Sequence, residues 1–224
     1  PGEIVVDTEG GASLFYIKGH DPEKISRLVA KFQASPTANA IFVTARRPAN
    51  GCSPGAVKGF APGTFALEFA GQCLISHGPD MIVTYRWDDA ANPFGVPGTQ
   101  WIPGGPAPGQ QEPHNGHGGL NPYVTHSTLF AAGRDFAQGK AIDVPAGNQD
   151  IAPTLLAMQG LPVPASLDGR VLSEALKNPT KARRLKSSTG RIEVSAGSYC
   201  AQLEVSYAGD HVYLNQARRC AAKP

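Results

Sequence analysis

The sequence lacks a long apolar run, a strong excess of charge of either sign and any Cys-x-x-Cys pair. No stretch reaches the roughly 18 apolar residues that a membrane-spanning helix needs, and no signal peptide is recognisable, so no membrane span is expected. The net charge of +2 over 224 residues is too small to predict binding to a nucleic-acid polymer. The missing Cys-x-x-Cys spacing argues against a zinc or redox site of that common kind.

What the chain does contain is typical of a globular protein with long ordered loops. Its hydrophobic content of 41% is enough for the core of one domain, or of one domain with a small appendage. Glycine occurs 26 times and proline 20 times, above the usual share, which indicates long loops around a scaffold. Such loops often carry functional sites.

The four cysteines fall into two local pairs, Cys52 with Cys73 and Cys200 with Cys220. Two disulfides in a periplasmic or secreted protein are the favoured interpretation, although four cysteines allow three connectivities and four buried thiols remain the alternative. Cys200 and Cys220 flank a predicted hairpin, so a bond between them would fasten the C-terminus.

Local patterns in the first half predict a mixture of strands and helix. Residues 4–6 and 13–17 flank a glycine turn and read as a hairpin. Asp21 is a natural N-cap before Pro22, and the apolar stripe that follows is typical of an amphipathic helix packed on a core. With strand 40–44 these elements predict a β-α-β-like unit. Further strands are expected at 65–70 and 80–87, and the adjacent pair Asp88 and Asp89 is interpreted as a loop cap.

The second half mixes loop, strand, helix and a terminal β element. The proline-rich stretch 90–121 is expected to be a long loop, in which Phe94, Trp101 and Tyr123 could shape a substrate pocket. A strand is predicted at 128–132. Asn148 and Asp150 offer caps to a helix ending at Met158, and capping explains Asp150 at least as well as a catalytic role. From Arg191 onward the pattern predicts a hairpin or meander with a turn at 208–210.

His117 is the most informative single residue. It lies in a loop between glycines, which allow the backbone to crowd a ligand, and imidazole is a common donor to zinc and similar ions. A solvated loop histidine is the alternative. His114 and His126, together with Asn121 and Tyr123, are candidates for contacting the substrate or for supporting such a site.

Four stretches give the sequence a resemblance to a known family. Gly116–Tyr123, Ser127–Phe136, Gly147–Leu156 and Leu161–Pro164 resemble the C-terminal half of the alkaline phosphatase superfamily, and most closely its type I phosphodiesterase/nucleotide pyrophosphatase branch. The similarity extends from about Gly10 to Leu176. Arg134 departs from the pattern, since the family usually has proline there.

The resemblance implies a fold and a division of the chain. The fold class would be α/β: the C-terminal part of an α/β/α sandwich with a mixed central sheet, followed by a small β-hairpin or meander. Residues 1–176 would belong to the catalytic domain, 177–190 would form a basic connector and 191–224 would be an appended β element. The basic residues of the connector could attract anions, but a solvated linker is favoured.

The resemblance also implies a function. The expected reaction is hydrolysis of a phosphodiester or nucleotide pyrophosphate bond with two divalent metal ions, most often zinc, and His117 as the last protein ligand of one ion. The expected substrate is a small phosphate ester or a nucleotide. Hydrolysis of phosphomonoesters or phosphonates is the alternative within the superfamily, and a non-catalytic binding module stapled by disulfides is the alternative of another class.

The family's other ligands and its Ser or Thr nucleophile have no counterpart in this sequence. There is no Asp-His-Gly motif, no Asp-x-x-x-His spacing suited to a ligand pair and no nucleophile motif before a helix. We therefore expect the N-terminal part of the enzyme to be a separate chain, and this chain to be inactive by itself.

Overall fold

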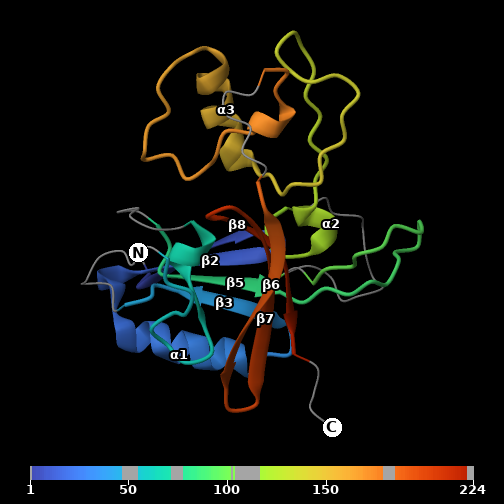
Figure 1. Cartoon of the computed structure of the whole chain (residues 1–224). Coiled ribbons are helices and arrows are strands. Elements are labelled where there is room, and N and C mark those ends of the chain that lie inside the picture. Colours follow the sequence, from blue (N-terminus) through green and yellow to red (C-terminus); the bar gives the residue numbers. More distant parts are fainter. Residues whose placement is uncertain are drawn as a thin grey trace. The chain divides into compact units, whose positions relative to one another are not determined.

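A computed structural model describes residues 2–46, 55–71, 78–101, 103, 117–178 and 185–220. The chain forms two compact units (Figure 1). Unit 1 comprises Pro1–His126, Arg191–Leu203 and Asn215–Pro224, and unit 2 comprises Ser127–Gly190 and Glu204–Leu214. The expected division at residues 176 and 190 stays a prediction.

Unit 1 is built on a mixed five-stranded sheet, so the expected α/β class with a mixed sheet is confirmed. The strand order is β1-β2-β5-β3-β4. The pairs β1–β2, β2–β5 and β5–β3 are antiparallel, whereas β4 runs parallel to β3. The strands are β1 (Ile4–Glu9), β2 (Ala12–Ile17), β3 (Ala38–Val43), β4 (Phe65–Ala66) and β5 (Met81–Tyr85).

The predicted hairpin and helix are confirmed. β1 and β2 pair in register from Ile4↔Ile17 to Glu9↔Ala12. A short 3-10 turn, η1 (Lys18–His20), leads to α1 (Pro22–Gln33), where the Asp21 carboxylate accepts hydrogen bonds from two backbone amides of the first turn. Because β2 and β3 both pair antiparallel with β5, they run parallel to each other, so β2, α1 and β3 form a β-α-β unit with β5 between its strands.

The core of unit 1 lies between this sheet and its neighbours. Every residue of β3 is buried, as expected for a strand covered on both faces. Ile25 and Val29 of α1 are buried as well, and Phe32 of the same stripe contacts Phe15 edge to face at 5.2 Å between ring centroids. Burial of the apolar stripe, more than helix propensity, is what holds α1 in place.

The last strands form a separate three-stranded antiparallel sheet in the order β6-β7-β8, which confirms the predicted meander. The strands are β6 (Ser187–Ala196), β7 (Tyr199–Ala208) and β8 (His211–Arg219), with Gly197 and Gly209 at positive φ in the two turns. The disulfide Cys200–Cys220 closes the end of this sheet, with its Cα atoms 5.3 Å apart.

In unit 1, β8 is fastened to the five-stranded sheet by polar contacts as well as packing. The carbonyl oxygen of Ala217 accepts hydrogen bonds from the Asn39 side chain at 2.7 Å and from the Trp87 indole at 2.8 Å. The buried Tyr199 hydroxyl donates to the carbonyl of Asn39 at 2.6 Å. Buried polar groups that are paired in this way fix one register of one sheet against the other.

Two predicted strands differ in the structure. Only Phe65–Ala66 of the stretch 65–70 is strand, and Leu67–Ala70 continues as a 3-10 turn, η3. Residues 128–132 were expected to form a strand, but they carry no regular secondary structure and are exposed. A strand requires a neighbour for its backbone hydrogen bonds, and an apolar sequence alone does not provide one.

The remaining helical elements are short. They are α2 (Pro122–Thr125), η4 (Asn148–Asp150), α3 (Ile151–Met158) and η5 (Ser173–Ala175). The helix predicted to end at Met158 is thereby confirmed. Within the described residues, no helix is long and apolar enough to cross a membrane.

Candidate functional site

His117 lies beside the tip of the β1–β2 hairpin, where two glycine-containing segments of backbone meet. The amide of Gly11 donates to the carbonyl of His117 at 3.1 Å. The side chain of Gln100 donates to the carbonyl of Gly11 at 3.3 Å. His117 is thus held by its backbone, while its side chain is 82% exposed.

Three glycines make this close approach possible. A Cβ on Gly11 would collide with the carbonyl of Gly118, and a Cβ on Gly118 would collide with the carbonyl of Glu9. A Cβ on Gly119 would lie 2.6 Å from the carbonyl of Gly11. Gly118 and Gly119 also have φ of +75° and +90°, a conformation that side-chain-bearing residues adopt at a cost.

Glu9 is the charged neighbour of His117, and no motif in the sequence predicts this contact. Its Oε2 lies 3.4 Å from Nδ1 of His117. A carboxylate near one ring nitrogen favours the tautomer that carries a proton there and leaves Nε2 with its lone pair. An exposed imidazole with a carboxylate behind it fits the donor that a zinc-type ion takes.

By itself His117 does not form a complete metal site among the described residues. The only group there of three or more His, Cys, Asp or Glu side chains that converge is Glu193, Cys200 and Cys220, which lacks His117. Any ion at His117 would need further ligands from outside the part of the chain that the structure describes.

The other predicted residues near His117 have partners of their own. Asn121 is buried and caps α2: its Oδ1 accepts from the amide of Tyr123 at 2.9 Å, and its Nδ2 donates to the carbonyl of Gly98 at 2.9 Å. The Tyr123 ring meets Trp87 edge to face at 6.3 Å. His126 follows the last residue of α2 and is exposed. Their roles toward a substrate stay predictions.

Three of the sequence candidates, His114, Cys52 and Cys73, lie outside the described residues. The carboxylates at the end of β5 can be placed. Asp88 accepts a hydrogen bond from the amide of Ala90 at 2.8 Å, which confirms the loop cap. Asp89 pairs with Arg218 at 3.2 Å, and the Arg218 guanidinium lies 3.7 Å above the centre of the Trp87 ring.

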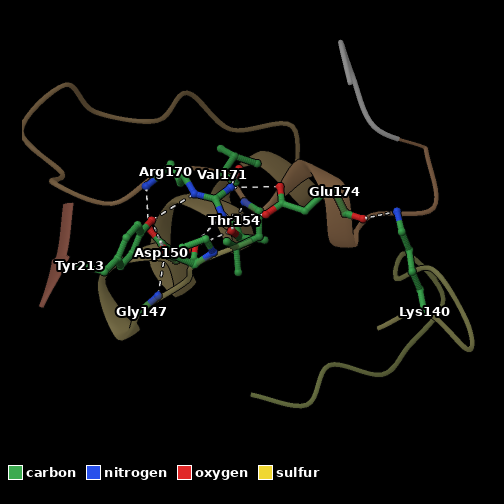
Figure 2. A network of polar contacts seen from close by, with 10 residues as sticks. Lys140, Gly147, Asp150, Thr154, Arg170, Val171, Glu174 and Tyr213 are labelled. Atoms are coloured by element: carbon green, nitrogen blue, oxygen red, sulfur yellow. Dashed lines mark hydrogen bonds and ion pairs between the residues drawn. The ribbon is translucent and has the colours of Figure 1, made fainter. Parts of the chain in front are cut away.

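Unit 2 contains a buried polar network centred on Asp150 (Figure 2). Its fully buried carboxylate accepts hydrogen bonds from the amide of Gly147 at 2.8 Å, the amide of Arg170 at 2.8 Å and the hydroxyl of Tyr213 at 2.9 Å. Gly169 permits the approach, because a Cβ there would overlap the backbone of Gln149. These partners give Asp150 a structural role and leave it no exposure to a substrate.

Arg170 continues the network toward η5. Its guanidinium binds both carboxylate oxygens of Glu174, at 2.7 and 3.0 Å, as well as the carbonyl of Pro145 at 2.8 Å and the Tyr213 hydroxyl at 3.1 Å. Burial would raise the pKa of Glu174, but the hydrogen bonds from Arg170 outweigh it, and the pKa is lowered. Burial, and then the hydrogen bond to Asp150, raises the pKa of Tyr213 to about 12.

No family model, curated protein or solved structure matches the chain.

Replacing Gly118 by alanine should destabilise the protein more than the same change at Gly19. Both glycines have φ of +75°, but only Gly118 would place the new Cβ against another backbone, since nothing lies within 4 Å of Gly19. We expect about 1 kcal/mol for Gly19→Ala from strain, and a further 1–3 kcal/mol for Gly118→Ala from the collision. Urea denaturation measures the difference. Hydrogen exchange of the Gly11 amide should accelerate only in Gly118→Ala, and equal effects of the two variants would contradict the packing described.

Asp150→Asn should destabilise the protein by about 3–5 kcal/mol. The amide loses the charge that strengthens three hydrogen bonds, and its NH₂ group can meet a backbone donor in place of an acceptor. Asp143→Asn, at an exposed carboxylate of the same unit, is the control and should change stability by less than about 0.5 kcal/mol. Both values come from denaturant melts, and a neutral Asp150→Asn would exclude the network as a major contribution.

Proposed function

We propose that this chain is the C-terminal part of a metal-dependent phosphohydrolase that cleaves phosphodiester or nucleotide pyrophosphate bonds. In this proposal the central sheet belongs to an alkaline-phosphatase-like α/β/α sandwich. A companion polypeptide, the N-terminal part of the enzyme, supplies the Ser or Thr nucleophile and the remaining metal ligands. The enzyme acts on a small phosphate ester or nucleotide in the periplasm or after secretion. The Cys200–Cys220 disulfide supports that location.

The observation that carries the proposal is the way in which the glycines around His117 are used. The motif Gly116–Gly119 resembles the family's ligand motif. In this structure Gly118 and Gly119 allow the backbone next to His117 to lie against the β1–β2 turn, and the His117 ring is exposed. The carboxylate of Glu9, 3.4 Å from Nδ1, gives this exposed ring the kind of orienting partner that metal-binding histidines usually have.

The surface of unit 2 supports the need for a companion. α3 is apolar except for Thr154, whose hydroxyl is used internally, between the carbonyl of Asp150 and the amide of Leu172. A helix that is apolar all round is normally buried, yet Ile151 and Leu155 are exposed. Exposed apolar surface of this kind marks a contact with another protein surface.

The segment 128–132 also supports the need for a companion polypeptide. Its apolar composition is typical of a strand, but it carries no regular secondary structure and is exposed, with Phe130 90% accessible. The backbone of such a segment can accept a neighbouring strand from another polypeptide. We infer that the companion covers this segment and α3.

In the proposed reaction, bound metal ions would lower the pKa of the nucleophilic hydroxyl and stabilise the leaving oxygen. The contribution of this chain is to hold a neutral imidazole at His117, with Nδ1 toward Glu9 and Nε2 available. Phosphomonoester or phosphonate hydrolysis uses the same chemistry, and assays with mono- and diester substrates separate these alternatives.

Removing the imidazole should remove metal and activity together. We expect His117→Ala, in the enzyme purified with its companion, to lower bound zinc by about one ion and hydrolysis of bis(p-nitrophenyl) phosphate by about 100-fold or more. His211→Ala, whose ring contacts the carbonyl of Asp168, is the control and should retain both. The measurements are native mass spectrometry, metal analysis and the diesterase assay. A metal-free chain without a companion would instead favour a disulfide-stapled binding module.

Phe130→Asp should weaken binding of the companion by about 30-fold or more, as expected when a central apolar contact worth about 2 kcal/mol is lost. Phe94→Asp changes a comparably exposed phenylalanine of unit 1 and should leave the affinity unchanged. Surface plasmon resonance on reconstituted parts measures both. Equal affinities for wild type and Phe130→Asp would remove segment 128–132 from the proposed interface.

A further inference from the structure

Three metal-ligand side chains converge at one end of the β6–β8 sheet. Glu193 of β6, Cys200 of β7 and Cys220, which follows β8, each place a ligand atom within 4.8 Å of the other two. Glu193 is exposed, and both cysteines are partly accessible. All three belong to unit 1.

The strands already hold the two cysteines at a suitable spacing. The amide of Cys220 donates to the carbonyl of Cys200 at 3.1 Å, and their Cα atoms lie 5.3 Å apart. In a tetrahedral zinc site, Zn–S bonds of about 2.3 Å place two sulfur atoms about 3.8 Å apart. Once the disulfide is reduced, rotation about the two Cα–Cβ bonds can reach that separation without any change of strand register.

Glu193 supplies the third donor. The side chain of Gln202 on β7 donates to its Oε2 at 3.4 Å, and a hydrogen bond of this kind orients a metal-binding carboxylate. Zinc takes thiolate and carboxylate ligands, and sites with three protein ligands keep a water molecule in the fourth position. The two thiolates favour zinc strongly over magnesium or calcium.

We propose that Cys200, Cys220 and Glu193 form a redox-gated zinc site, in which the disulfide and the metal ion are alternative cross-links of the same two strands. A dithiol reductant supplies two electrons and two protons to the disulfide and becomes a disulfide itself. Binding of Zn²⁺ to the two thiols then releases those two protons. Oxidation of the bound thiolates by a disulfide oxidant reforms the Cys200–Cys220 bond and expels the ion.

In this proposal β7 and the residue that follows β8 are cross-linked in both redox states, by the disulfide when oxidised and by the metal ion when reduced. Reduction without metal would remove the covalent link at this end and leave β8 held by its pairing with β7 and by non-covalent contacts such as those of Ala217 with Asn39 and Trp87. Zinc would restore the cross-link. The proposal concerns residues other than His117 and is independent of the phosphohydrolase proposal.

Cobalt(II) is the probe for the test, because its thiolate complexes absorb in the near-ultraviolet and zinc can displace it. The full chain, with any companion that copurifies, carries Cys52→Ser and Cys73→Ser so that only Cys200 and Cys220 can respond. We expect one equivalent of cobalt, with a thiolate charge-transfer band, after reduction by a phosphine under anaerobic conditions. The oxidised protein should show no such band.

Two variants assign the ligands. Cys200→Ser should abolish the two-thiolate band, and Glu193→Gln should weaken zinc binding by about 10–100-fold in competition with a chromophoric chelator. Glu23→Gln, an exposed carboxylate on α1, is the charge control and should bind as tightly as the parent. Circular dichroism verifies that the reduced protein keeps its strands.

Each result of these measurements either supports or overturns the zinc site. A reduced, folded protein without a cobalt–thiolate band overturns the site. Equal zinc affinities of Glu193→Gln and Glu23→Gln overturn the role of Glu193. If the reduced protein unfolds without metal, refolding on addition of one equivalent of zinc supports the site, and failure to refold overturns it.

Discussion

The close approach of Gly11 to Gly118 and Gly119 is the constraint on which the candidate site depends. Backbones can come this near only where no Cβ intervenes, and the same contact fixes the β1–β2 turn against the loop that carries His117. Sheet and site are therefore coupled. β2 pairs with β5, and the tip of its hairpin also determines where the imidazole is presented. A rearrangement of that turn would move His117 even if every strand stayed intact.

Unit 2 is organised on a different principle. Its center is a buried carboxylate, and its apolar residues are largely at the surface. Asp150 draws together the start of α3, the segment around Arg170 and the Tyr213 hydroxyl, so three stretches far apart in sequence share one charge. A buried charge is tolerable when every lone pair has a donor. This arrangement orders the loops of the unit alongside a few buried apolar residues such as Leu172 and Val205.

The elements that could be predicted from the sequence are those specified by neighbouring residues. Asp21 and Pro22 predict the start of α1, the glycine turn predicts the first hairpin, and the alternation of apolar and polar residues after Arg191 predicts the meander. Contacts over long separations could not be predicted. Glu9 beside His117, or Tyr213 beside Asp150, depends on which segments the fold brings together, and no local pattern records that. The predicted strand at 128–132 failed for the same reason, because pairing requires a partner that its own sequence does not specify.

That failure is informative about the molecule. Unit 2 contains both an unpaired segment with strand composition and a short apolar helix with exposed side chains. This departs from the agreement between local and global preferences that natural sequences usually show. Ile151, Leu155 and Phe130 are exposed together in one unit, whereas the same kinds of residue in unit 1 are mostly buried. Exposure of several large apolar side chains on a short helix and an unpaired segment of one unit is expected where another surface covers them. A strand supplied by the proposed companion would give residues 128–132 the pairing partner that this chain does not provide.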